Sequence, residues 1–386
     1  MSGFTFNAPR RVICRAGAIQ DLGGIAKTTI GSPLLIVTDP GVCEAGLLAP
    51  VKAALDEAGV EFAVFAGVQA DPPDAVVLAA TESALNIGAV GVIGLGGGSS
   101  MDVAKLVALL ARGNEQLADI YGVDKVTGDR LPLIQIPTTA GTGSEVTPVA
   151  IVTVGKSEKK GVVSPCLLPD VALLDARLTL GLPAPVTAAT GVDAMVHAIE
   201  AYTSRNPNNN PVSAVLALQA LSLLGRHIKT AVHDGSDLQA REGMLLGAML
   251  AGQAFANSPV AAVHALAYPL GGRYHLPHGL SNALVLAHVM RFNRPVCAGA
   301  YARLATQIFP ELAAYEDKEA RCDALIEALA ALVEELGIKP RLRDYGISKE
   351  ALAALAGDAM EQTRLLVNNP RELSEADALA IYGAAW

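Results

Sequence analysis

The sequence predicts an α/β domain with a parallel sheet over residues 1–180 and an all-α domain over residues 181–386. Up to about residue 180, short apolar runs alternate with helical segments, which is typical of βαβ units. One apolar run ends in a glycine-rich loop that opens a helix. After Leu182 no segment has a convincing strand pattern, so the second domain is expected to be helical.

Four buried strands are expected in the first domain, over residues 34–39, 62–65, 90–95 and 133–137. Two helices are expected between them, over residues 51–58 and 73–87. Gly59 ends the first of these helices, and Pro73 stands at the start of the second.

The helices expected in the second domain cover residues 185–204, 212–232, 238–256, 260–270, 279–292 and 320–336, with weaker patterns over 349–356 and 374–382. Residues 206–211 read Asn-Pro-Asn-Asn-Asn-Pro and are expected to form an exposed loop. We expect the ligand site in the cleft between the two domains, where such sites are common.

The composition excludes several classes of function. Half of the residues are apolar and 17% are charged, so sizeable cores can form, and the net charge of −9 argues against nucleic acid or an anionic membrane as partner. The 5 cysteines have no paired spacing, which indicates reduced thiols in a cytoplasm. Residues 1–11 lack the apolar region of a signal peptide, and no run approaches the length of a transmembrane helix.

The glycine-rich loop over residues 94–105 reads Gly-Leu-Gly-Gly-Gly-Ser-Ser-Met-Asp-Val-Ala-Lys. Its glycines let a phosphate approach the backbone, and the helix that follows offers free N–H groups at its positive end. Ser99 and Ser100 can donate to the phosphate, and these two residues or Asp102 can cap the first turn. A plain strand–helix turn is the alternative, but three consecutive glycines lose backbone entropy that such a turn need not lose.

A second loop over residues 137–147 also leaves a strand and reads Pro-Thr-Thr-Ala-Gly-Thr-Gly-Ser-Glu-Val-Thr. Its hydroxyls and glycines suit a polar, phosphorylated or ribosyl ligand. The alternative is a capped turn in which Thr142 or Ser144 is the N-cap residue.

Asp39 ends the first expected strand. An acid in this place accepts hydrogen bonds from ribose hydroxyls and repels a 2′-phosphate, so it predicts NAD over NADP. No Arg or Lys lies next to it in the sequence. The alternative is that Asp39 only begins the turn at Pro40-Gly41.

One carboxylate and three imidazoles in the second domain have the pattern of a metal site. Asp193 and His197 are four residues apart, so a helix places them on one face. His264 lies in a second helical run, and His278 opens a third. Mixed N and O ligands suit Zn or Fe(II) better than Mg or Ca. The alternative is that each histidine is a satisfied core residue, but a buried Asp193 would be costly without a cation or donor.

With these motifs in place, the chain resembles the iron-dependent, or group III, alcohol dehydrogenase family. The matching stretches are residues 96–102, 137–147, 189–200 and 277–283. They stand in the family's order, and the length and domain plan fit end to end. The resemblance implies a dehydroquinate synthase-like architecture, in which a dinucleotide-binding domain precedes a metal- and substrate-binding helical domain.

The resemblance also implies roles for individual residues. The metal ligands would be Asp193, His197, His264 and His278. The cofactor-binding residues would be Gly97, Gly98 and Ser99 at the pyrophosphate, Thr138, Thr139, Thr142, Ser144 and Val149 at the nicotinamide, Lys159 at a ribose, and Leu178 and Leu182 at the adenine. The family uses NAD(P) with Fe(II), sometimes Zn, and its members often form dimers, so a homodimer is expected.

One position departs from the family pattern. Many members carry a further histidine four residues after the third metal ligand, and here that residue is Tyr268. Tyr268 or His275 is the candidate to replace it in proton transfer, and the sequence leaves both open.

The function expected from these residues is reversible hydride transfer between a primary alcohol or aldehyde and NAD, with the metal as Lewis acid. The apolar residues Phe255, Val149 and Tyr268 favour a simple alcohol over a polyol. The alternatives are a maleylacetate reductase-like or polyol dehydrogenase activity on the same fold, and a non-catalytic NAD-binding regulator. Maleylacetate reductases depart from the ligand set that is intact here, and a regulator would leave that set unexplained.

Overall fold

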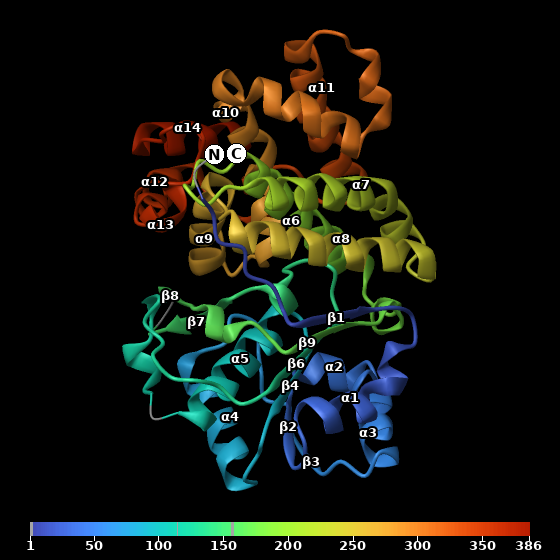
Figure 1. The fold of residues 1–386 in the computed structure, drawn as a ribbon. Helices are drawn as coiled ribbons and strands as arrows, with labels where there is room; N and C mark the ends of the chain where they lie inside the picture. The colour runs from blue at the N-terminus through green and yellow to red at the C-terminus, as the bar shows by residue number, and fades with distance from the viewer. Residues whose placement is uncertain (1–2, 114, 156–157) are drawn as a thin grey trace. The chain divides into compact units, whose positions relative to one another are not determined.

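The computed structural model describes residues 3–113, 115–155 and 158–386 (Figure 1). Contacts divide the described chain into an α/β unit, residues 7–181, and a helical unit, residues 182–386 together with residues 3–6. Residues 3–6 group with the helical unit although they precede the α/β unit in the sequence. Thr5 and Asn208 exchange two hydrogen bonds of 2.9 Å, which attaches this segment to the helical unit.

The α/β unit is built on a six-stranded sheet in the order β1-β9-β6-β4-β2-β3, and all its strand pairs are parallel. The strands are β1 (Arg11–Cys14), β2 (Leu34–Val37), β3 (Phe62–Phe65), β4 (Val92–Gly96), β6 (Leu133–Pro137) and β9 (Val171–Leu174). The register pairs Leu35 with Val92 and Val92 with Leu133. The parallel sheet expected from the alternating pattern is therefore confirmed.

Helices cover both faces of this sheet (Figure 1). They are α1 (Leu22–Thr29), α2 (Pro40–Glu44), α3 (Leu48–Glu57), α4 (Asp74–Asn86) and α5 (Gly98–Arg112). Leu34 and Ile36 pack in one apolar core with α1 and α3, whereas Leu35 and Val37 pack in another with α4 and α5. Because both faces are buried, the central strands read as continuous apolar runs.

All four expected strands are present, but the sequence pattern missed five others. A second, three-stranded sheet has the order β5-β8-β7 and consists of β5 (Gly122–Val123), β7 (Val149–Val154) and β8 (Glu158–Val163). β1 and β9 were not expected either. β8 begins with charged residues, β1 is an exposed edge strand, and the four residues of β9 are too short to distinguish a strand from a helix.

The helical unit contains no strand among its described residues. Its helices are α6 (Ala184–Thr203), α7 (Pro211–His233), α8 (Leu238–Asn257), α9 (Ala262–Tyr274), α10 (His278–Ile308), α11 (Lys318–Glu335), α12 (Leu352–Met360), α13 (Thr363–Leu366) and α14 (Glu375–Ala385). The fold class expected from the sequence is thus confirmed. α10 is far longer than the expected helix over 279–292, because it continues through Pro295.

Short 3₁₀ helices connect these elements. They are η1 (Ala18–Asp21), η2 (Leu117–Asp119), η3 (Ser144–Val146), η4 (Pro165–Leu167), η5 (Ala176–Thr179), η6 (Pro310–Ala314), η7 (Leu342–Tyr345) and η8 (Lys349–Ala351).

The loop expected to be exposed at residues 206–211 is only partly so, because Pro207 and Pro211 are exposed whereas its asparagines are half-buried or buried. Asn209 donates to the carbonyl of Ser204 at 2.7 Å. Asn210 is buried and caps α7 by accepting from the backbone N–H of Ser213 at 3.0 Å. The asparagines bond to backbone groups of the helical unit, which holds the loop against it.

The structure corrects the expectation that no run of residues approaches the length of a transmembrane helix. Among the described helices, α7 alone is long and apolar enough to cross a membrane by length and composition. It packs against α6, α8 and α10 in the helical unit.

Candidate metal centre and cofactor loops

Helix α6 places the first two candidate ligands side by side. Asp193 and His197 lie one turn apart on its buried face and are 1% and 4% exposed. α6 begins beside prolines and is rich in alanine, which favours a helix at this point. The i, i+4 spacing in the sequence therefore places the two side chains next to each other.

The third and fourth candidate ligands come from α9 and α10. His264 is buried in α9, and His278 is the first residue of α10. Gly279 lets this end of α10 approach α6 closely, because a Cβ there would lie 2.3 Å from the carbonyl oxygen of Ala189. The approach brings His278 Nε2 to 3.6 Å from Asp193 Oδ1.

The four side chains form one cluster in the helical unit. One ligand atom from each of Asp193, His197, His264 and His278 lies within 4.8 Å of the other three. The rings of His197 and His264 are stacked with their centroids 4.7 Å apart.

The donor set fits a divalent transition metal. Burial by itself would raise the pKa of Asp193, but His197, His278 and His264 outweigh burial and hold that pKa below its usual range. Asp193 is therefore a carboxylate, and three imidazole nitrogens stand beside it. One oxygen and three nitrogen donors at this spacing suit Fe(II) or Zn.

Glu200 orients one of the imidazoles, a role that the sequence analysis did not assign. Its Oε2 lies 2.6 Å from Nδ1 of His264, and its Oε1 accepts from the backbone N–H of Val263 at 2.7 Å. A carboxylate in this place keeps the proton on Nδ1 and leaves the lone pair of Nε2 for a metal. The available sequence signal was the spacing of seven residues from Asp193, which is two helical turns along the same face.

Asn282 is a second residue at the cluster that the sequence analysis did not assign. It lies one turn after His278 on α10 and is fully buried. Its Nδ2 donates to Asp193 Oδ1 at 2.6 Å and lies 3.3 Å from Nε2 of both His264 and His278.

Two aromatic side chains border the cluster. Phe255 stacks on His197 at 4.4 Å between centroids, and the ring of Tyr268 lies 5.9 Å from that of His278. His275 is exposed, ends α9 in the left-handed conformation with φ 54°, and is not one of the four clustered residues. Of the two candidates for proton transfer, Tyr268 is thus the one beside a candidate ligand.

In the α/β unit, the loops that follow β2, β4 and β6 lie at the same edge of the sheet, because these strands are parallel neighbours. Gly97 is the N-cap residue of α5, and Gly98 is its first residue. A Cβ on Gly98 would lie 2.9 Å from the side chain of Thr142. The two loops singled out in the sequence therefore touch. Thr138 N also donates to the carbonyl of Gly96 at 3.0 Å.

The side-chain caps that the sequence left possible at these loops are absent from the described structure. No side chain caps α5 in the described structure, and Ser100 instead donates to Asp39 Oδ2 at 2.8 Å. The N-cap residue of η3 is Gly143, not Thr142 or Ser144. Thr142 Oγ1 does accept from the backbone N–H of Ser144 at 3.3 Å.

Asp39 begins the turn at Pro40-Gly41, which was the alternative to a role in cofactor binding. It is the N-cap residue of α2, and its Oδ1 accepts from the backbone N–H of Val42 at 3.0 Å. Because Ser100 donates to the other carboxylate oxygen, Asp39 is held against the phosphate helix α5. Its interaction with a ribose stays a prediction.

A buried lysine ties α5 to the second loop, and the sequence analysis gave it no role. Lys105 is 0% exposed, and its Nζ donates to Ser144 Oγ at 2.8 Å, Thr147 Oγ1 at 3.1 Å and Val149 O at 2.6 Å. Burial lowers the pKa of Lys105 to about 8, although nearby Asp102 opposes that change.

Asp102 belongs to the same buried cluster. It accepts from Ser144 Oγ at 2.6 Å and from the backbone N–H of Ile151 at 2.9 Å. Burial raises the pKa of Asp102 despite the opposing effects of Lys105 and these hydrogen bonds. The hydrogen bonds given above for Asp102 and Ser144 are therefore all bonds to other residues of the α/β unit.

The remaining predicted cofactor residues are distributed more widely. Thr139 lies next to the glycine loop, with its Oγ1 3.6 Å from where a Cβ on Gly97 would be. Lys159 forms an ion pair with Asp71. Leu178 is buried in the α/β unit, whereas Leu182 is half-buried at the start of the helical unit.

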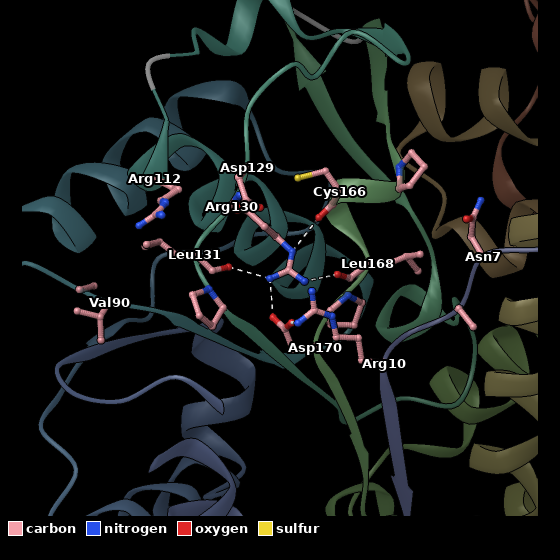
Figure 2. A pocket seen from close by; sticks show the side chains of 15 residues that line it. Asn7, Arg10, Val90, Arg112, Asp129, Arg130, Leu131, Cys166, Leu168 and Asp170 are labelled. Carbon is pink, nitrogen blue, oxygen red and sulfur yellow. Dashed lines mark hydrogen bonds and ion pairs between the residues drawn. The ribbon is translucent and has the colours of Figure 1, made fainter. Parts of the chain in front are cut away.

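A cavity of about 780 Å³ lies elsewhere in the α/β unit and contains none of the predicted site residues (Figure 2). Its lining residues precede β1, β4, β6 and β9, so it lies at the opposite edge of the sheet from the glycine loop. Arg130 crosses it and donates to the carbonyl of Cys166 at 2.8 Å and to Asp170 at 2.6 Å (Figure 2). Arg130 therefore links the loop that precedes β6 to the loop that precedes β9.

A parallel sheet with glycine loops at its carboxyl edge, followed by a helical unit with a four-ligand cluster, defines the class of metal-dependent dehydrogenases. Sequence profiles of two families extend this assignment over most of the chain. The profile described as "Iron-containing alcohol dehydrogenase" matches residues 9–176, and that described as "Fe-containing alcohol dehydrogenase family, C-terminal" matches residues 187–386.

Known proteins resemble the chain along its whole length. Long-chain-alcohol dehydrogenase 1 of Geobacillus thermodenitrificans is 41% identical over 379 residues, 96% of this chain and 93% of that protein. A crystal structure of 1,3-propanediol oxidoreductase matches with a TM-score of 0.96 at 34% identity, over 100% of both chains. Sulfoacetaldehyde reductase of Bifidobacterium kashiwanohense, solved in complex with NAD+, matches with a TM-score of 0.89 at 28% identity, over 100% of this chain and 99% of that one. The chain belongs to the iron-containing alcohol dehydrogenase family and is an alcohol oxidoreductase.

Proposed function

We propose that this enzyme transfers hydride reversibly between a primary alcohol or aldehyde and NAD, at a divalent iron held by Asp193, His197, His264 and His278. The observation that carries the proposal is the convergence of these four ligand atoms within 4.8 Å. A metal bound there supplies a Lewis acid that polarises the oxygen of the substrate. Zn is the alternative ion, because the same donors accept it.

Three side chains around the cluster, those of Glu200, Phe255 and Tyr268, define what the protein adds to this chemistry. Glu200 keeps Nδ1 of His264 protonated, so that Nε2 faces the metal. Phe255 and Tyr268 give the site an apolar border, which supports a simple aliphatic or aromatic alcohol as substrate. Tyr268 shapes the pocket in this proposal and is not an obligate acid or base.

The cofactor is proposed to be NAD, bound at the carboxyl edge of the sheet. The N-terminus of α5 offers backbone N–H groups to the pyrophosphate, and Gly97 and Gly98 leave room for it. The residues proposed to contact NAD are Asp39, Gly97, Gly98, Ser99, Asp102, Thr138, Thr139, Thr142, Ser144, Val149, Lys159, Leu178 and Leu182. The NAD+ complex of the Bifidobacterium relative supports this choice.

The proposal is tested by loading the purified protein with Fe(II) or Zn in the absence of oxygen and supplying alcohols and aldehydes with NAD or NADP. We expect one metal ion per chain by elemental analysis, and turnover at the absorbance band of reduced nicotinamide. A metal-loaded protein that binds NAD but turns over nothing in the panel would favour the regulator. Oxidation of glycerol in preference to simple alcohols would favour a polyol dehydrogenase.

We also propose that the enzyme is a cytoplasmic homodimer. None of the 5 cysteines forms a disulfide in the described structure, as expected of a reducing compartment. β1 is an edge strand with exposed residues, and such an edge can pair with a second chain. Sedimentation equilibrium tests the dimer, and a monomer at micromolar concentration would contradict it.

A further inference from the structure

The amide of Asn282 bonds to the same atoms that a metal ion needs. Its nitrogen lies 2.6 Å from Asp193 Oδ1 and 3.3 Å from Nε2 of His264 and of His278. An amide nitrogen carries two hydrogens, which Asp193 Oδ1 and an imidazole nitrogen without a hydrogen can accept. The opposite orientation would turn the amide oxygen toward the carboxylate, so Nδ2 is the atom that faces the cluster.

The lone pair of His264 Nε2 serves one partner at a time. Because Glu200 keeps the proton on Nδ1, Nε2 carries a single lone pair and no hydrogen. That lone pair either accepts from Asn282 or coordinates a metal. The hydrogen bond and the coordination bond therefore exclude each other at this atom.

No other hydrogen bond in the described chain holds the amide of Asn282. Its oxygen is buried and has no hydrogen-bond partner among the described residues. The hydrogen bonds found for this side chain are thus the three to candidate metal ligands. The amide can turn away from the cluster without breaking any other hydrogen bond in the described structure.

We propose that Asn282 competes with the metal: its amide stabilises the ligand set without metal and is displaced when a metal binds. The inference rests on the proposed four-ligand set. It assigns Asn282 a positioning role that weakens metal affinity, so that the ligands stay ordered and the ion can exchange. Any interaction made only in one state shifts the binding equilibrium away from the other state.

The test is the zinc affinity of the full-length Asn282→Ala variant, stripped with a chelator and titrated against a fluorescent zinc chelator. We expect the dissociation constant for zinc to tighten about tenfold, the factor equivalent to about 1.4 kcal/mol. The melting temperature of the stripped protein should fall more than that of the zinc-loaded protein. Weaker or unchanged zinc binding would overturn the proposal, because Asn282 would then support the bound metal or be indifferent to it.

Asn293 offers a matched control on the same helix. It is also buried, but it exchanges hydrogen bonds with Asn369 at 3.0 and 2.8 Å. Asn293→Ala should lower both melting temperatures equally and leave zinc affinity within about twofold, since its bonds do not involve the candidate ligands. A tenfold tightening in this control would show that any buried cavity in α10 produces the effect.

A second measurement keeps the proposal falsifiable if Asn282→Ala fails to fold. Crystal structures of the wild-type protein prepared with and without zinc should differ in the distance from Asn282 Nδ2 to His264 Nε2. We expect hydrogen-bonding distance without zinc and a longer separation with it, and an unchanged distance would overturn the inference. Failure of the wild type to bind one zinc per chain would instead refute the four-ligand set.

Discussion

Replacing Glu200 by glutamine tests how the protein prepares His264 for a metal. Both carboxylate oxygens of Glu200 accept hydrogen bonds, at 2.6 Å from His264 Nδ1 and at 2.7 Å from the N–H of Val263. Glutamine has the same shape but only one oxygen, so its NH₂ group must face one of these donors. Either the backbone N–H is left unsatisfied or the imidazole loses the partner that orders its proton.

The magnitude follows from the burial of this group. Glu200 is 3% exposed, and a hydrogen bond to a charged group in such a place contributes about 1.5–3 kcal/mol. If the whole loss fell on the metal-binding form, affinity would fall by about 10- to 150-fold. Removing such outer partners of metal-ligating histidines typically costs about 10- to 100-fold, which agrees.

The assay is zinc competition against a fluorescent chelator, with a circular dichroism spectrum to establish that the variant folds. Glu327→Gln is a suitable control, because Glu327 pairs with Arg291 on the exposed surface. A folded Glu200→Gln protein whose zinc affinity changes by less than about twofold would refute the reasoning. Glu200→Gln is expected to weaken zinc binding, whereas Asn282→Ala is expected to tighten it.

Three further outcomes are expected. Tyr268→Phe should keep kcat within about tenfold of wild type, because the pKa of a phenol is poorly matched to proton transfer at neutral pH. A loss of about 10²-fold or more in kcat would assign the hydroxyl a catalytic role. Wild type should prefer NAD over NADP by about tenfold or more in kcat/KM, and Asp39→Gly should reduce that preference. An unchanged preference would show that Asp39 serves only as the N-cap residue of α2. Lys105→Met should lower the melting temperature and weaken NAD binding measured by calorimetry, because it removes the buried hydrogen bonds of Nζ to Ser144, Thr147 and the carbonyl of Val149, while zinc affinity stays unchanged. Unaltered NAD binding would restrict Lys105 to a structural role.

The sequence predicted that Asp193 and His197 lie side by side because the information for that pair is local. Asp193 and His197 share a helix face by spacing alone, and His278 follows a proline that starts a helix. The alternation of apolar runs likewise predicted the parallel sheet, since strands buried on both faces are continuously apolar.

The residues that support the cluster were not predictable in the same way. Glu200 and Asn282 act through His264, which is 64 and 18 residues away in the sequence. Lys105 reads as an ordinary helix residue until the second loop closes over it. Helix α10 was expected to end near residue 292, yet it continues through Pro295, although prolines usually end or kink helices.

The close approach of Gly98 to Thr142 restricts how this enzyme can diverge. A Cβ on Gly98 would lie 2.9 Å from Cγ2 and 3.1 Å from Oγ1 of Thr142, so any larger residue at 98 requires a smaller one at 142 or a shifted loop. Related sequences should therefore vary at these two positions together. Mutant libraries that randomise one loop while keeping the other constant should recover almost only glycine at position 98.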